Sequence, residues 1–466
     1  MGCRVRSMTV SSMDACCKFT MTQLLSSQKK SLRWCLGNIH PEPSRSACIP
    51  EAALRGFCEV LFQDQKWAEI WTVEDVGNVL WQLLHGRSEL LTGVVGSLSE
   101  IENVELLDQL CREAIQELES YPRQYNIYIE LPGLYWEGAT ITELILTDSM
   151  TLLGTAKPSV ATSALIRPDR PLGDTSCAST VEEFMEAIAP VAAILLRRET
   201  IYLQILEKGF LNPLRLNEMP VMLSAALLKL KVLLVFAMEI GLLERREVYR
   251  LEYPTDGDWG EPVHVACHEA TDSGKACLGL PNDMGNFLRG ITFTTLKQVT
   301  ISGIKGLLTP ILEFIETLDS DEHAVGIGAG IEGLLDSLVS SNQTVSLLQC
   351  CIGIESILGE KNSGMQELGT TARLAERYSY LMGDSVPDRI RLREDFRKIF
   401  LKRGELVHAR KTRLSLRDNW IVPKAQEMLQ RLIRKELSLH LGIDAGRLVK
   451  MQLEHLRMDY SVSRWR

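Results

Sequence analysis

The sequence is poor in aromatic residues and has no excess of positive charge. Phe, Trp and Tyr make up 6% of its 466 residues, and 60 Asp and Glu outnumber 51 Lys and Arg, which gives a formal net charge of −9. The few aromatic residues, beside 33 Gly, favour helical packing over a large β-sandwich. A chain that nucleic acid surrounds is usually basic, so any contact with nucleic acid is expected only in a local patch.

The sequence also lacks an uncharged apolar run long enough to cross a bilayer. The best candidate is Val221–Leu243, which Lys229, Lys231 and Glu239 interrupt, and a charge near the bilayer centre costs at least about 2.5 kcal/mol. We therefore expect a long buried helix whose lysines reach solvent. The first 50 residues contain no basic start followed by an apolar core and a cleavage site. These absences predict a cytoplasmic protein with no membrane partner.

Most signatures of metal and cofactor chemistry are missing as well. There is no Walker A, HExxH, GxSxG or EF-hand motif. The residues His264, Cys267, His268 and Cys277 match the spacing of no common structural zinc site, so we predict no metal and no cofactor. The glycine cluster Gly326–Gly330 follows no strand, and we interpret it as a site of close helix packing. The twelve cysteines, in a chain too long for a small disulfide scaffold, are expected to be reduced thiols.

Length and patterning predict an α+β fold that is predominantly α-helical, with a mixed α/β N-terminal region followed by an antiparallel helical bundle. Residues 1–60 lack periodicity and are expected to form a poorly ordered lead-in. Residues 61–288 are expected to form a mixed α/β domain with a sensor or regulatory role, and residues 289–466 a helical domain. Helical spacing covers Trp67–Leu84, Ile101–Leu118, Val181–Leu206 and Met219–Arg246, and strands are predicted over Tyr125–Leu131, Ala139–Leu146, Val248–Tyr253 and Pro262–Cys267, the last two as a hairpin.

The C-terminal region is a succession of predicted helices joined by short connections. Pro387 and Pro423 fall where the first turn of a helix tolerates proline. Helices joined by short loops pack naturally as an antiparallel bundle. The predicted helices span Ala324–Val339, Thr344–Leu358, Met365–Leu381, Pro387–Lys411 and Pro423–Leu441.

One part of this region is strongly basic. Arg389–Arg417 contains eleven Lys and Arg against three acids, a net charge of +8 over 29 residues, so the rest of the chain carries −17. A solvated surface helix gives this pattern. A basic helix on an acidic protein is also what a local contact with a phosphate backbone requires. Charge alone does not decide between the two interpretations.

The apolar pattern of this helix favours the second interpretation. Its core-facing stripe has one position missing, and Arg403 occupies that position. A guanidinium in an apolar seam is costly unless an anionic or polar group meets it. Gly404 follows, at a cost of about 1 kcal/mol relative to Ala, and His408 points about 140° away from Arg403 around the helix axis. A second copy of the helix, packed nearby, would let both residue types reach one target. The stripe consists of Leu392, Phe396, Ile399 and Leu406.

Arg403 to His408 fits the R-x4-6-H motif of HEPN domains, and its surroundings resemble the Apea-like HEPN group of prokaryotic defence proteins. The resemblance covers about residues 324–441, and the region before residue 288 carries no motif that we can place. The segments Ile327–Val339, Val345–Glu360, Leu374–Arg377 and Phe396–His408 follow one another in family order.

The resemblance implies a HEPN-type bundle that forms a homodimer through the motif helix and acts as a metal-independent endoribonuclease. His408 would exchange a proton with the 2′-hydroxyl or the leaving oxygen, because the ordinary pKa of histidine lies near neutrality. Arg403 would hold the scissile phosphate. Glu355 would orient Arg403, although it also fits an ordinary surface glutamate, and Gly404 stands where active members commonly carry a polar residue. RNA would contact the basic residues Arg397, Lys398, Lys402, Arg410 and Lys411.

Three functions remain open on the sequence. The first is a ribonuclease effector or toxin in antiphage or abortive-infection defence, whose N-terminal region senses a phage or cellular trigger. The second is a non-catalytic RNA- or nucleotide-binding HEPN module, which Gly404 keeps open. The third is an adaptor protein whose basic helix binds an acidic partner. Cleavage of labelled RNA in EDTA separates the first from the others, and salt-sensitive RNA binding without cleavage selects the second.

Overall fold

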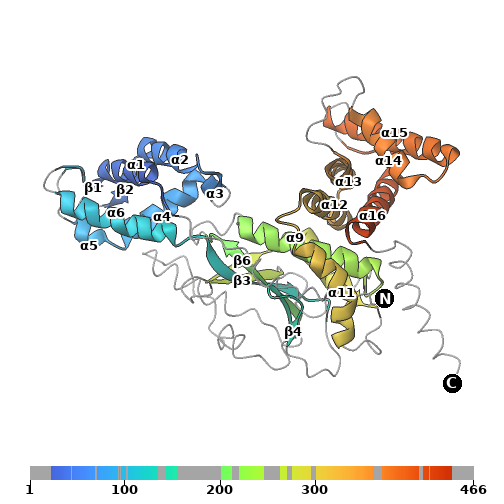
Figure 1. Cartoon of the computed structure of the whole chain (residues 1–466), viewed down its shortest axis with the longest axis horizontal. Coiled ribbons are helices and arrows are strands. Elements are labelled where there is room, and N and C mark those ends of the chain that lie inside the picture. The colour runs from blue at the N-terminus through green and yellow to red at the C-terminus, as the bar shows by residue number, and fades with distance from the viewer. Residues whose placement is uncertain are drawn as a thin grey trace, which may run out of the picture. The chain divides into compact units, whose positions relative to one another are not determined.

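The computed structural model of the chain divides into two compact units (Figure 1). Unit 1 comprises Met1–Gln124 and Lys208–Val221, and unit 2 comprises Tyr125–Glu207 and Met222–Arg466. Most described elements are helices, and the strands form a small antiparallel sheet and two short pairs, so the predominantly helical α+β fold is confirmed. The structure describes residues 23–42, 45–68, 71–92, 94, 96–100, 103–134, 143–154, 201–211, 220–245, 263–269, 275–294, 301–359, 370–408, 413–418 and 420–442.

Unit 1 consists of helices and one short strand pair. The helix predicted over Trp67–Leu84 is two helices, because Thr72 starts the second one with a capping box. The Thr72 Oγ1 accepts a hydrogen bond from the Asp75 N–H at 3.2 Å, and the Asp75 carboxylate accepts one from the Thr72 N–H at 2.9 Å. The elements are α1 (Ser26–Gly37), β1 (His40–Glu42), β2 (Arg45–Cys48), α2 (Glu51–Leu61), α3 (Gln65–Ala68), α4 (Val73–His85), α5 (Ser88–Leu91) and α6 (Val104–Glu119), the last confirming the predicted second helix.

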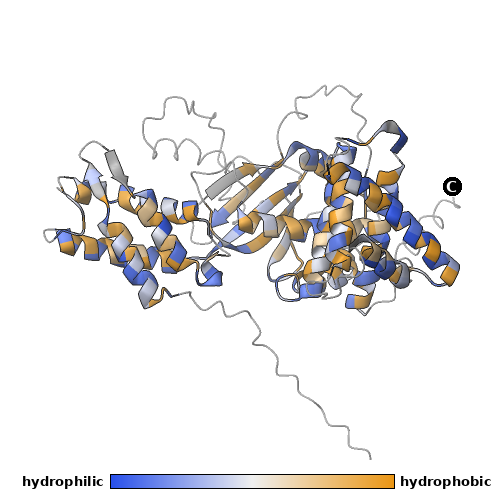
Figure 2. Cartoon of the chain, turned by 90° about the horizontal axis from the view of Figure 1, so that it is seen from above, coloured by the Kyte–Doolittle hydropathy of each residue, from blue (hydrophilic) through white to orange (hydrophobic). Residues whose placement is uncertain are grey.

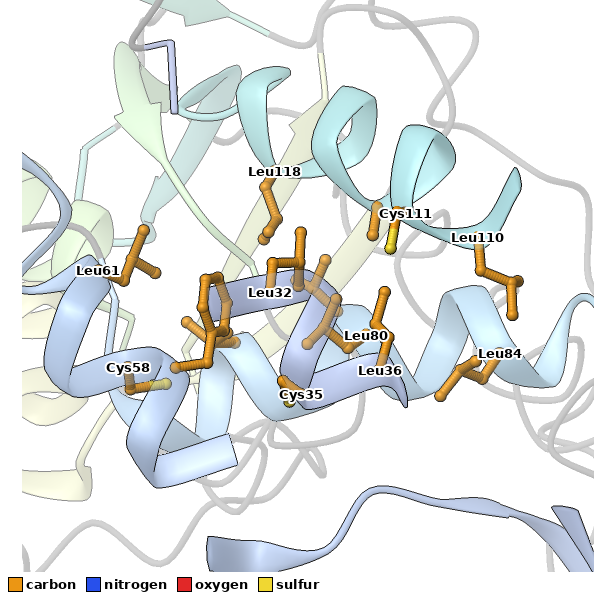
Figure 3. Packing of buried hydrophobic residues seen from close by; sticks show 14 of the residues in the cluster. Leu32, Cys35, Leu36, Cys58, Leu61, Leu80, Leu84, Leu110, Cys111 and Leu118 are labelled. Carbon is orange, nitrogen blue, oxygen red and sulfur yellow. The ribbon is translucent and has the colours of Figure 1, made fainter. Parts of the chain in front are cut away.

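The core of unit 1 includes residues that were expected to be poorly ordered. Leu32, Cys35 and Leu36 of α1 are fully buried, and side chains of α1, α2, α4 and α6 point toward one another in Figure 3. The prediction of a poorly ordered lead-in over residues 1–60 is therefore wrong for α1 and α2. The exposed Ser, Lys and Arg residues of α1 and the polar but buried Gln28 make its few apolar positions hard to recognise from composition. Residues 1–22 lie outside the described part of the chain.

Unit 2 contains a six-stranded sheet with the strand order β4-β5-β6-β3-β8-β9. The strand predicted over Tyr125–Leu131 is confirmed as part of β3, where Ile127 and Ile129 are fully buried. β3 pairs with β8, and Ile127 lies opposite Cys267. The strands span β3 (Arg123–Leu131), β4 (Glu143–Ile145), β5 (Met150–Gly154), β6 (Ile201–Gly209), β8 (His264–Glu269) and β9 (Lys275–Gly279).

One segment predicted as a helix is a strand. Residues 201–206, the end of the helix predicted from Val181, lie in β6. Leu203 and Ile205 are fully buried there and Tyr202 is 2% exposed. A strand buried on both faces has a nearly continuous apolar run, which periodicity cannot separate from a buried helix. The part of this prediction before residue 201 lies outside the described residues.

Two predicted strands find different partners. β8 covers most of the strand predicted over Pro262–Cys267, and it pairs with β9, with Ala266 opposite Cys277. The hairpin partner expected at Val248–Tyr253 lies outside the described residues. The strand predicted over Ala139–Leu146 is described from residue 143 as β4, which pairs with β5.

Helix α9 (Val221–Glu239) is the long apolar helix that the sequence predicts. By length and composition alone it is the one described helix that could cross a membrane, and 67% of its apolar window is buried inside the protein. Its lysines do not reach solvent as expected, because Lys229 Nζ lies 2.7 Å from Glu207 of β6 and Lys231 Nζ lies 2.7 Å from Glu332. These pairs connect the sheet to the C-terminal helices. Both belong to unit 2, so the two units do not divide at residue 288, where the sequence predicted a domain boundary.

The five predicted C-terminal helices are confirmed, and the striped colouring of Figure 2 shows their hydrophobic and hydrophilic residues. α12 and α13 pack closely through glycines, since a Cβ at Gly326 would lie 3.0 Å from the Ser356 carbonyl oxygen and one at Gly333 would lie 2.7 Å from that of Gln349. The interpretation of the glycine cluster as a packing site is confirmed. The elements are β7 (Leu243–Arg245), which pairs with β10 (Ile291–Phe293), α10 (Asn282–Gly290), α11 (Ile301–Ile315), α12 (Glu322–Val339), α13 (Gln343–Leu358), α14 (Thr370–Met382), α15 (Val386–Val407) and α16 (Ile421–His440).

Candidate functional site

The motif residues lie at the end of α15, the basic helix. Ser385 starts this helix by accepting a hydrogen bond from the Asp388 N–H at 3.3 Å, and Pro387 occupies the first turn. The helix ends at Val407, four residues earlier than predicted, and residues 409–412 lie outside the described part. The motif Arg is therefore in the last helical turns, and the motif His directly follows the last helical residue.

The predicted apolar stripe of α15 faces the core of the bundle. Leu392 is 5% exposed, and Phe396 and Ile399 are fully buried. The Phe396 ring stacks on Phe400, with 4.3 Å between the ring centroids. Leu406, the last member of the stripe, is half-buried. The stripe thus becomes more exposed toward the end of the helix, where the motif begins.

Arg403 finds its polar partner on α13. Its Nη2 donates a hydrogen bond to Glu355 Oε2 at 3.2 Å, and the two side chains are 31% and 32% exposed. Burial raises the pKa of the neighbouring Cys351 thiol, and the Cys350 and Glu355 side chains raise it further, while Arg403 acts in the opposite direction. The contact expected between Glu355 and Arg403 is present. It does not use up the guanidinium, which has five N–H donors and can also bind a phosphate.

Gly404 has no packing reason to be glycine. A Cβ at this position would meet no atom of the described residues within 4 Å. This position differs from those in α12, where glycines allow two backbones to approach. The side chain that is missing at Gly404 would point into open space beside the motif.

His408 is exposed, and its backbone hydrogen bonds the preceding helical turn. It is the C-terminal cap of α15, with φ −88° and ψ 21°, and its N–H donates to the Gly404 carbonyl oxygen at 3.1 Å. Among the residues that the structure describes, its imidazole makes no hydrogen bond or ion pair. Within one chain, nothing described brings this imidazole to the Arg403 guanidinium.

The basic residues expected to contact RNA differ in how available their charges are. Arg397 is exposed and makes no ion pair within the described residues. Lys398 is exposed and lies 3.6 Å from Asp395. Lys402 is less available than expected, because its Nζ lies 3.2 Å from both Glu405 and Asp418. The remaining two, Arg410 and Lys411, lie outside the described residues.

The pairing of Lys402 with Asp418 is a feature that the sequence did not suggest. Asp418 is 9% exposed and accepts a hydrogen bond from Ser415 Oγ at 2.7 Å. The Ser415 bond and the neighbouring Lys402 lower the pKa of this carboxyl, against the opposing effect of burial. The Leu414 N–H donates to Thr344 Oγ1 of α13 at 3.0 Å. The segment that follows the motif is therefore attached at two points, and a Ser-x-x-Asp spacing was its only sequence signal.

The described residues offer no metal centre. No group of three or more His, Cys, Asp and Glu side chains in this part of the chain is placed to hold a metal ion. Six described cysteines are unbridged and buried, and they include the Cys350–Cys351 pair next to the candidate site.

The arrangement can thus hold an anion at a half-exposed guanidinium and offer an exposed imidazole at the same helix end. Comparison with known proteins adds no family to this description: no family model, no curated protein and no solved structure matches the chain.

Proposed function

We propose that this protein is a HEPN-type, metal-independent endoribonuclease that works as a homodimer. The observation that carries the proposal is the 3.2 Å contact between Arg403 and Glu355, which joins the two helices that the resemblance pairs. The strongly basic character of α15 supports a nucleic-acid substrate. RNA fits better than DNA because the 2′-hydroxyl supplies an internal nucleophile, so cleavage needs no metal-activated water.

The chemistry follows from the two motif side chains. The 2′-oxygen attacks the adjacent phosphorus, and the bond from phosphorus to the 5′-oxygen breaks. One imidazole accepts the proton from the 2′-hydroxyl, and a protonated imidazole gives a proton to the leaving 5′-oxygen. Arg403 binds the phosphate oxygens, whose negative charge grows during the attack. The products are a 2′,3′-cyclic phosphate and a 5′-hydroxyl.

A second copy of the chain supplies the second guanidinium and the second imidazole that the end of one α15 helix lacks. An ideal helix continued to His408 would place this residue about 140° from Arg403 around the helix axis, and one imidazole cannot accept and donate a proton at once. Two motif helices that face each other bring two guanidiniums and two imidazoles to one phosphate. In this proposal the site is shared between protomers, and the cytoplasmic protein acts as a defence effector that a phage or cellular trigger releases through the N-terminal region.

Single variants test the assignment of roles. Purified protein with labelled single-stranded RNA in EDTA is expected to cut, and Arg403→Ala and His408→Ala are expected to lose cleavage while remaining folded. Arg391→Ala is the matched control, because Arg391 lies on the same helix and pairs with Asp388. Cleavage that survives His408→Ala would end the proposed mechanism.

Mixed dimers test whether the site is shared. Co-expression of the Arg403→Ala and His408→Ala chains with different tags gives a dimer with one intact arginine and one intact histidine. We expect only partial recovery, because the mixed dimer has lost one guanidinium, and one lost donor to a transferring phosphate costs about 2.7–4 kcal/mol. It has also lost one imidazole, so that water must take part in one of the two proton transfers. A heterodimer of the wild-type chain with a double-variant chain is the control, and high activity there would place the whole site within one protomer.

Non-catalytic RNA binding is the second candidate, and one observation favours it. The Gly404 position has open space where a polar side chain would stand, and no side chain of the described residues orients the His408 imidazole. Salt-sensitive RNA binding without any cleavage selects this function.

A further inference from the structure

An open hollow lies beside the candidate site in unit 2. It has a volume of about 1260 Å³ and is bordered by the start of α12, the end of α13, one side of α14 and the end of α16. Its apolar wall includes Val325, which is 50% exposed, and Leu381. The hollow has room for a nucleobase, and its lining combines apolar side chains with several charged ones.

Glu355 connects the hollow to the motif. The same carboxylate that accepts the Arg403 hydrogen bond at 3.2 Å also lines the hollow. If Arg403 holds a phosphate, as the proposed function on which this inference rests requires, the attached nucleoside lies at the rim of the hollow. Only a sugar separates that phosphate from its base.

Tyr380 gives the hollow an aromatic surface. Its side chain is 63% exposed and lines the hollow, and the Arg389 guanidinium carbon lies 4.8 Å from the centre of its ring. This cation–π contact holds the ring in place without burying it. Exposed aromatic rings are the surfaces on which single-stranded bases stack.

The charged side chains that line the hollow determine whether the base or the phosphate of a nucleotide fits inside it. Asp321, Glu322 and Glu436 line the hollow with Glu355, against His323 and Arg377. Carboxylates repel phosphate, and they accept hydrogen bonds from the N–H groups of base edges. A base therefore fits inside, and the phosphates fit outside along α15, where Arg397 and Lys398 are exposed.

We propose that this hollow binds one nucleobase of a single-stranded RNA, stacked on Tyr380, while the adjoining phosphate rests on Arg403. Duplex RNA is excluded as the preferred ligand, because its bases are paired and stacked inside the helix. The substrate class is then a single-stranded or looped RNA with an unstacked base next to the cut.

Fluorescence of an uncleavable RNA tests the proposal independently of catalysis. The probe is a 2′-O-methyl single strand with one 2-aminopurine, titrated with the full-length protein at one fixed salt concentration. Tyr380→Ala is expected to raise the dissociation constant about 5- to 150-fold, the range for loss of one stacked base, and to remove the change in 2-aminopurine emission. Tyr380→Phe keeps the ring and is expected to bind as the wild-type protein does.

Trp420→Ala is the matched control. Trp420 is also an exposed aromatic residue of the same bundle, 53% exposed, and it does not line the hollow. Its loss is expected to leave RNA binding unchanged. Since Tyr380 is largely exposed, Tyr380→Ala is expected to retain the wild-type circular dichroism spectrum and melting temperature.

The outcomes separate this inference from the proposed function. If the protein cuts and binds RNA but Tyr380→Ala binds as tightly as the wild type, the hollow does not hold a base and the proposed function stands. If the protein binds RNA more weakly after Tyr380→Ala but never cleaves it, the base site stands and the ribonuclease proposal falls. Equal affinity for a matched duplex would overturn the preference for single strands.

Discussion

Arg403 and Glu355 form a contact whose value lies in orientation more than in stability. Both side chains are about one-third exposed, and exposed ion pairs contribute about 0–1 kcal/mol to folding. A guanidinium held at one edge by a carboxylate keeps its other donors pointed in a fixed direction, which is what a phosphate site needs.

Glu355→Gln tests whether Glu355 orients Arg403 more than it stabilises the fold. The amide keeps an acceptor for Arg403 and removes the charge. The free energy of unfolding in urea is expected to change by less than about 1 kcal/mol, and the cleavage rate at saturating RNA to fall about tenfold or more, which corresponds to about 1.4 kcal/mol of lost transition-state stabilisation. A large loss of stability with an unchanged rate would make Glu355 an ordinary structural residue.

Gly404→Ala is expected to stabilise the protein. The added Cβ meets no atom of the described part of the chain within 4 Å, and alanine is better than glycine in a helix interior by about 1 kcal/mol. Gly333→Ala is the matched change in α12, where the added Cβ would lie 2.7 Å from the Gln349 carbonyl oxygen. Urea unfolding is expected to show a gain for the first and a loss for the second. A loss at Gly404 would mean that an undescribed contact requires the glycine.

The described segment between α15 and α16, residues 413–418, gives Lys402 a role other than the expected one. Its ammonium lies between Glu405 and Asp418, and Asp418 in turn binds Ser415. Helix ends fray unless something holds them. The pair therefore holds the end of α15, where the motif lies, against the start of the segment that leads to α16.

The Asp418 carboxyl predicts a pH dependence of stability. The hydrogen bond from Ser415 and the neighbouring Lys402 lower its pKa in the folded state from the ordinary value of 3.8. The stabilisation is complete above the unfolded pKa and is lost as pH falls through the lower folded pKa. The difference in unfolding free energy between the wild type and Asp418→Asn is expected to be constant from about pH 5 to 7 and to disappear toward about pH 2. A difference that persists in acid would contradict an ionic role.

Salt titrations of RNA binding separate Lys402 from Arg397. Each lost phosphate contact reduces the slope of log affinity against log salt by about 1. Arg397→Ala is expected to reduce the slope, because Arg397 is exposed and unpaired within the described residues. Lys402→Ala is expected to leave it unchanged, because that charge is already neutralised. The opposite ranking would restore the initial assignment of Lys402 to RNA.

The sequence predicted local patterns well and long-range pairings poorly. Helical spacing and proline positions located the five C-terminal helices, since each buries one face against its neighbours. β6 was misread because both of its faces are buried, and α1 because its apolar positions are few. The Arg403–Glu355 contact was predicted only through the family resemblance. The contact of Lys402 with Asp418 depends on how the chain returns after the motif, which no local pattern encodes.

The whole protein is expected to be a dimer. Within the described residues of one chain, Arg403 contacts Glu355 and nothing brings the His408 imidazole to it, so the proposed site is incomplete in one chain. Light scattering at micromolar concentration is expected to give about 105 kDa, twice the chain mass of 52.3 kDa. A monomer at all concentrations would exclude a site shared between protomers.

The end chemistry of RNA fragments tests the central claim most directly. Wild-type protein in EDTA is expected to convert a labelled single-stranded RNA into fragments with 2′,3′-cyclic phosphate and 5′-hydroxyl ends, and His408→Ala to produce none. Fragments with 5′-phosphate and 3′-hydroxyl ends, or cleavage that EDTA abolishes, would contradict a metal-independent mechanism that uses the 2′-hydroxyl and His408.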